Sequence, residues 1–117
     1  MTQRRPREKD KPNLEFIREL ACIICGDDTA TEAAHIRYSD SRVAKINSGI
    51  QQKPHDRYTM PLCGKHHREQ HNFGNERAWW SVKGIDDPIF YALALHGCTG
   101  DHQTGSEIIR NRLDAMQ

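Results

Sequence analysis

The chain has 117 residues, of which 36% are apolar and 28% charged, and its formal net charge is +1. This length suits one small domain, and no apolar run is long enough to cross a membrane. The first residues lack the apolar core of a secretory signal, so we expect a cytoplasmic location, where disulfides are rare. Four cysteines and seven histidines therefore favour metal ligands over disulfides.

A basic arm and a short helix come first in chain order. Residues 1–12 carry five basic and two acidic residues and two prolines, which predicts a flexible, disordered arm. Asn13 can cap a helix over residues 14–20. The apolar face of that helix consists of Phe16, Ile17 and Leu20.

The middle of the chain favours two strands joined by a long basic loop. Strands are predicted at residues 31–38 and 57–62, the second being stopped by Pro61, and a loop at residues 39–53. Residues 37–68 contain seven basic and two acidic residues, a net charge of +5. This concentration of positive charge favours an anionic partner such as a phosphate backbone.

The rest of the chain is expected to be mainly helical. The predicted helices span residues 64–73, 76–82, 88–95 and 106–116, and the linker before the last helix spans 97–105. Four aromatic side chains in this part either cover the core or form a stacking platform for single strands: Phe73, Trp79, Trp80 and Phe90.

Two short motifs have the spacing of metal ligands. Cys22 and Cys25 are separated by two residues, and so are Cys63 and His66. A two-residue spacer lets both side chains of a turn reach one ion, so the two pairs predict a closed structural zinc site. A redox-active cysteine pair would need a βαβ context that the chain lacks. Zinc would compensate for the small core that a polar chain of this length can bury.

Three further histidines are candidates for chemistry. His67 and His71 are four residues apart, so on a helix they share one face and suit a divalent ion. A solvated helix face is an equally open interpretation of these two residues. His35 lies in the first predicted strand, where a lone histidine is more often a core residue.

The order of these motifs resembles the HNH, or His-Me finger, nucleases. The segments AAHIRY, KPHDRYTMPLCGKHHREQH, ERAWW and GIDDP are similar to phage and prophage HNH proteins, including the recombination enhancement function group. The resemblance covers roughly residues 14–95. It implies a small α+β fold, a zinc-braced ββα-metal core with flanking helices. The expected division is an arm at 1–12, a nuclease-like domain at 13–96, and a linker with a C-terminal helix at 97–117.

The resemblance also implies roles for individual residues. His35 matches the general base, and His67 and His71 match the ligands of one catalytic divalent ion (Mg²⁺, Mn²⁺, Ni²⁺ or Zn²⁺). The middle asparagine of the HNH pattern falls at Tyr58. Asp56 and His55, just before it, are the two open candidates for that role.

One position departs from the family. Ala34 stands where HNH proteins often have a metal-ligating Asp or His, so water and substrate oxygens must complete the ion's shell, or activity is lost. The expected function is metal-dependent DNA endonuclease activity in recombination or processing, in the cytoplasm of a bacterial host, with a recombinase filament as a candidate partner. The alternative is an inactive zinc-braced nucleic-acid-binding accessory protein. A third option is a phage adaptor that binds proteins through helices at 85–117.

Basic residues near His35 are the expected contacts to DNA. Arg37, two residues further along the same strand face, is a candidate phosphate clamp or an ordinary surface arginine. Backbone contacts with low sequence specificity are expected from the remaining cations of this region: Arg42, Lys45, Lys53 and Arg57.

Overall fold

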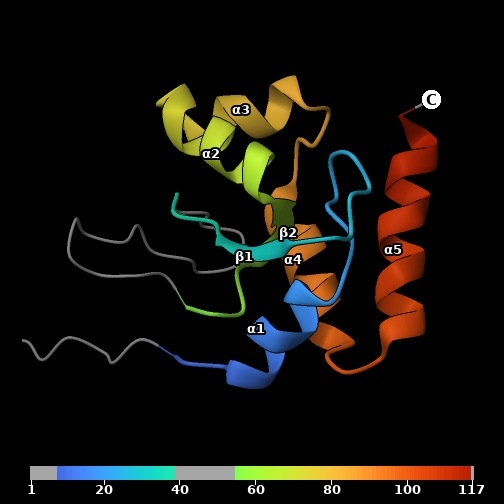
Figure 1. Ribbon diagram of the computed structural model, residues 1–117. Helices are drawn as coiled ribbons and strands as arrows, with labels where there is room; N and C mark the ends of the chain where they lie inside the picture. The colour runs from blue at the N-terminus through green and yellow to red at the C-terminus, as the bar shows by residue number, and fades with distance from the viewer. Residues whose placement is uncertain (1–7, 39–54, 117) are drawn as a thin grey trace, which may run out of the picture.

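A computed structural model describes residues 8–38 and 55–116 of the chain. This part contains seven elements: α1 (Lys11–Arg18), β1 (Thr31–His35), β2 (Thr59–Cys63), α2 (Gly64–Phe73), α3 (Glu76–Val82), α4 (Pro88–Gly97) and α5 (His102–Ala115) (Figure 1). The expected small α+β fold is confirmed. Within the described residues, no helix has the length and apolarity needed to cross a bilayer.

The two strands form an antiparallel hairpin that underlies the candidate site. Thr31 pairs with Cys63 at one end and His35 pairs with Thr59 at the other. β1 ends earlier than predicted, because the Arg37 amide donates to the Glu76 carboxylate of α3 (3.0 Å) rather than to β2. β2 runs through its proline, which was expected to stop it, and all five of its residues are buried.

The start of α1 differs from the prediction. Asp10, not Asn13, is the capping residue, and its side chain accepts a hydrogen bond from the Asn13 amide. Asn13 lies inside the helix and is fully buried, and its side chain donates to the Asp56 carbonyl oxygen (2.9 Å). The helix therefore begins at Lys11, inside the segment predicted as an arm. Residues 1–7 of that segment, and the whole of the loop predicted at 39–53, lie outside the described residues.

β2 continues into α2 without a loop. Cys63 is both the last residue of the strand and the N-cap of the helix. Gly74 ends α2 in the left-handed conformation (φ 89°), and the Asn75 side chain caps α3 by accepting from the Ala78 amide. Both helices have the bounds that the sequence predicted.

The two tryptophans of α3 belong to the core. Trp79 and Trp80 are 0% exposed, whereas Phe73 and Phe90 are about half exposed at 47% and 45%. The indole N–H of Trp80 donates to Glu76, which also binds the backbone beyond β1. A stacking platform built on the tryptophans is therefore excluded, because their faces are not accessible to bases.

α5 stands beside the loop that joins α1 to β1 (Figure 1). It begins at His102, four residues earlier than predicted, because Asp101 caps it by accepting from the Thr104 amide. Gly105, predicted as part of a linker, lies within this helix. A Cβ at that position would be 2.7 Å from the Phe16 ring, so the glycine allows α5 to pack closely on α1.

Candidate metal centre and histidine cluster

The cysteines of the first motif lie in a tight turn after α1. The Gly26 amide donates to the Cys22 carbonyl oxygen (2.8 Å), and Gly26 adopts a φ of 80° that favours glycine. The second motif lies at the junction of β2 and α2, where Cys63 ends the strand and His66 follows in the first helical turn. The Ile23 amide donates to the Pro61 carbonyl oxygen (3.0 Å), which fixes the turn against the strand.

These four side chains converge on one point. The ligand atoms of Cys22, Cys25, Cys63 and His66 all lie within 4.8 Å of one another. Among the described residues, no other group of three or more His, Cys, Asp or Glu side chains comes together in this way. The Cys25 and Cys63 sulfurs are 3.8 Å apart, and His66 Nδ1 lies 3.8 Å from Cys22 Sγ and 3.2 Å from Cys63 Sγ. Around a tetrahedral zinc, two sulfurs lie about 3.8 Å apart, and a sulfur and a nitrogen about 3.6 Å apart. The cluster therefore fits a structural metal ion such as zinc.

The protonation of two ligands is consistent with this assignment. Desolvation, strengthened by the neighbouring cysteines, raises the pKa of Cys25 to about 11. Desolvation also lowers the pKa of His66 below its usual value, so its imidazole is neutral near pH 7. A cation must displace the Cys25 proton when it binds, as zinc does at thiol sites, whereas His66 offers a free nitrogen lone pair.

His35 is paired with a buried carboxylate. Its Nε2 atom lies 2.9 Å from Asp56 Oδ1, and Asp56 is 2% exposed. Because a carboxylate only accepts, His35 donates from Nε2, and its Nδ1 carries the lone pair when the ring is neutral. His55, the other candidate for this role, instead accepts the Glu8 amide at its Nδ1 (2.7 Å). Of the two residues that sequence reasoning left open, Asp56 contacts His35, and which of them takes the role of the HNH asparagine stays a prediction.

A polar network behind Asp56 holds the pair in place. The Asp10 amide donates to Asp56 Oδ2 (2.8 Å). The Asp56 carbonyl oxygen accepts from the Asn13 side chain (2.9 Å) and from the Thr59 hydroxyl (3.0 Å). Asp10 in turn accepts from His96 Nε2 of α4 (3.0 Å). The N-terminus of α1 thereby anchors the carboxylate that orients His35.

His67 and His71 lie on one face of α2, as the spacing predicted. Their Nε2 atoms are 3.2 Å apart, and the ring centroids 4.9 Å. Two nitrogens bound at about 2.1 Å to one ion lie about 3.2 Å apart when they subtend roughly 100°. The pair therefore fits two positions of a divalent ion's shell. His67 Nδ1 also lies 2.6 Å from Glu32 Oε1, a contact that sequence reasoning missed.

Arg37 lies close enough to His71 to act on it electrostatically. Desolvation and the charges of His67 and Arg37 lower the pKa of His71, which keeps that imidazole neutral near pH 7. The Arg37 backbone is held by Glu76, as described above, and its side chain is at the surface. A cation beside the neutral imidazole of His71 is a favourable setting for a phosphate group.

The other predicted DNA contacts have different outcomes. Arg57 forms an ion pair with Glu8, so a phosphate would compete with an existing carboxylate partner. The remaining three predicted contacts lie in the segment outside the described residues: Arg42, Lys45 and Lys53.

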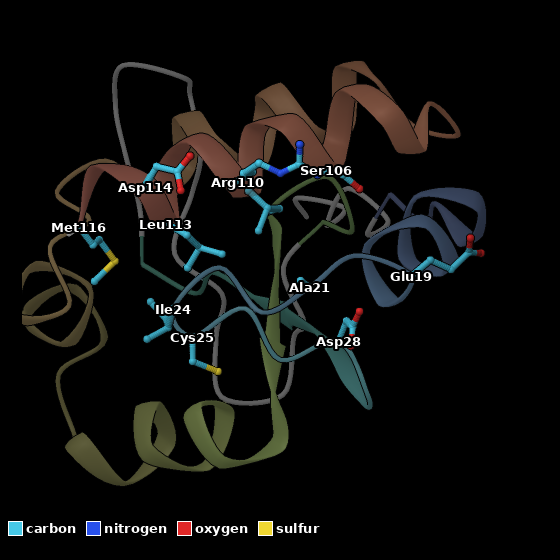
Figure 2. A pocket seen from close by; sticks show the side chains of 11 residues that line it. Glu19, Ala21, Ile24, Cys25, Asp28, Ser106, Arg110, Leu113, Asp114 and Met116 are labelled. Atoms are coloured by element: carbon cyan, nitrogen blue, oxygen red, sulfur yellow. The ribbon is translucent and has the colours of Figure 1, made fainter.

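A cavity of about 630 Å³ lies away from these histidines, between α5 and the turn that carries the first cysteine motif (Figure 2). Apolar side chains of Ile24, Leu113 and Met116 line it, together with Arg110 and several acidic groups. Cys25 is the one candidate zinc ligand on its wall. His35, His67 and His71 are not among its lining residues, so the candidate chemistry lies outside this cavity.

The fold and site define a small α+β domain in which a hairpin and the helix that follows it carry a possible metal centre. The family model described as "Protein of unknown function (DUF968)" matches residues 2–90. The chain belongs to this family. The match includes both groups of histidines and the four clustered ligands, and it ends within α4. No curated protein and no solved structure matches the chain.

Proposed function

We propose that this protein is a metal-dependent DNA endonuclease of the HNH type. The observation that carries the proposal is the pairing of His35 with Asp56 on a hairpin whose second strand continues into the helix bearing His67 and His71. A strand histidine oriented by a carboxylate can serve as a general base, and a helical histidine pair can hold a divalent ion, which together suit metal-dependent phosphodiester hydrolysis. The zinc-type cluster at the strand-helix junction supplies the rigidity that a small core lacks.

In this mechanism His35 is the general base. Asp56 holds the Nε2 proton, so Nδ1 takes a proton from the attacking water. Asp56 also stabilises the imidazolium that forms, in the way that a buried carboxylate supports a catalytic histidine. The polar network at the N-terminus of α1 keeps both side chains in this orientation.

His67 and His71 would hold the catalytic divalent ion. When bound, the ion neutralises charge on the phosphate and stabilises the leaving oxygen as a Lewis acid. Two imidazole ligands favour transition ions such as Mn²⁺, Ni²⁺ or Zn²⁺ over Mg²⁺, although Mg²⁺ is abundant. Arg37, whose backbone amide donates to Glu76, binds a non-bridging phosphate oxygen and positions the DNA backbone.

One observation supports a second candidate function. Ala34, at the position where HNH proteins often have a ligand, is 0% exposed and packs in the core. It offers no donor atom, so the ion would have only the two helical histidines as direct ligands among the residues discussed. A zinc-braced protein that binds nucleic acid without cleaving it is the alternative.

The resemblance also proposes a recombinase filament as partner, which a pull-down with a purified recombinase tests.

A plasmid-nicking assay separates the two functions. The wild type is expected to nick supercoiled DNA with Mn²⁺ or Mg²⁺, and His35→Ala to lose at least about 100-fold of that rate. His55→Ala is the matched control, because it removes a neighbouring histidine whose Nδ1 accepts the Glu8 amide. Binding without nicking by a folded wild type over a range of ions would establish the accessory role and exclude catalysis.

A further inference from the structure

Glu32 is the only acidic residue of β1, and its carboxylate faces the first turns of α2. Its Oε1 atom lies 2.6 Å from His67 Nδ1. A carboxylate can only accept, so His67 carries a proton on Nδ1, and when the ring is neutral its lone pair is on Nε2. That Nε2 atom lies 3.2 Å from His71 Nε2. One hydrogen bond thus sets both the tautomer and the ring orientation of His67.

The approach of Glu32 depends on the strand-helix junction. Glu32 pairs with Leu62 in the hairpin, two residues before α2 begins at Gly64. A Cβ at Gly64 would lie 3.6 Å from Glu32 Oε2 and 3.0 Å from the Arg68 guanidinium. Because position 64 has no side chain, the carboxylate and the guanidinium share the space above it. The register of the hairpin and this glycine together bring Glu32 to His67.

We propose that Glu32 is a positioning residue that prepares His67 to bind a divalent ion through Nε2, an inference that rests on the proposed ion site at His67 and His71. Histidine ligands commonly donate their second ring N–H to a carboxylate, which fixes the ring and raises its basicity. Glu32 performs this role from the strand, while His67 and His71 come from the helix. The carboxylate also adds negative charge beside the site where the cation would bind.

Calorimetric titration of Mn²⁺ into the zinc-loaded full chain tests this role directly. Mn²⁺ is chosen because it competes poorly with zinc for thiolate ligands. Glu32→Ala is expected to weaken Mn²⁺ binding about 10- to 100-fold, the usual effect of losing such a partner. Glu32→Gln should lose less, since its amide oxygen still accepts from Nδ1. Glu107→Ala, which removes an exposed acid on α5, should bind as the wild type does.

The outcomes distinguish this inference from the proposed activity. If His67→Ala abolishes Mn²⁺ binding while Glu32→Ala binds normally, Glu32 has no positioning role and the inference is overturned. If neither variant changes binding, the ion site itself is wrong and the inference falls with it. If both variants weaken binding but the wild type nicks no DNA, the endonuclease proposal fails while the role of Glu32 stands. Equal melting temperatures of the variants and wild type would show that the changes in affinity are local.

Discussion

Replacing Asp56 by asparagine separates the geometry of the His35 pair from its chemistry. The two Asp56 oxygens accept from His35 Nε2 and from the Asp10 amide. In Asp56→Asn the remaining oxygen still accepts from Asp10, and the new NH₂ group faces His35. The imidazole must then accept at Nε2 and carry its proton on Nδ1. The nitrogen that takes a proton from water in the proposed mechanism is thereby blocked.

The expected magnitudes follow from these two hydrogen bonds. A buried hydrogen bond to a charged group contributes about 1.5–3 kcal/mol, so Asp56→Ala, which loses both, should lower the free energy of unfolding by about 3–6 kcal/mol. Asp56→Asn keeps both contacts in neutral form, each weaker by about 1–1.5 kcal/mol, and should lose about 2–3 kcal/mol. A general base contributes roughly 10²- to 10⁴-fold, so nicking by the asparagine variant should fall at least about 100-fold in a folded protein.

Three measurements check this prediction. Thermal unfolding compares the two variants, nitrogen-15 chemical shifts report the tautomer of His35, and plasmid nicking reports activity. An asparagine variant that nicks within about threefold of the wild-type rate would contradict the reasoning. So would a wild-type His35 that already carries its proton on Nδ1.

Three further predictions concern stability. Metal analysis should find about one zinc per chain, and Cys63→Ser should lose it and unfold while Cys98→Ser keeps it, because the metal is part of the fold. Gly105→Ala should lower the free energy of unfolding by about 1 kcal/mol, since overpacking against α1 outweighs the helix propensity of alanine. Gly97→Ala, with open space at its Cβ, should not destabilise the protein, and calorimetric melting distinguishes the two variants. Hydrogen bonds from Thr104 lower the pKa of Asp101. The stability advantage of the wild type over Asp101→Asn should therefore be fully present above about pH 4 and disappear as the pH falls through the lowered pKa. Melting temperatures of the two proteins, recorded against pH, measure this difference.

Local spacing was enough to predict the features that depend on neighbouring residues. The two-residue spacers identified the four clustered cysteine and histidine ligands, since each pair is brought together by its own turn. The bounds of α2 and α3 were also predictable, because Gly74 and Asn75 mark the break between them. In these cases the chemistry that decides the structure lies within one turn of the chain.

Long-range contacts account for what the sequence did not reveal. Asn13 is a residue type that commonly caps helices. It is instead buried in the core, where it donates to the carbonyl oxygen of Asp56, a residue distant in the chain. Glu32 alternates away from His35 on β1, so its partnership with His67 depends on the register of the hairpin and on Gly64. Gly105 resembles a linker residue in the sequence, because its role in the helix, leaving room for the Phe16 ring, depends on a contact with α1. Each of these depends on which surfaces meet after folding.

The direct passage of β2 into α2 has a consequence for how this chain can vary. His66 faces the cysteine cluster and His67 faces Glu32, and adjacent residues on a helix differ by about 100° in direction. One residue inserted after Gly64 would turn His66 toward Glu32 and remove it from the cysteines. The same insertion would turn His67 away from Glu32, while its four-residue spacing to His71 would not change. A single substitution in α2 can therefore affect one of these contacts and leave the other. A change of length between Cys63 and His67 disrupts both the cysteine cluster and the contact of His67 with Glu32, so we expect related chains to keep this interval fixed.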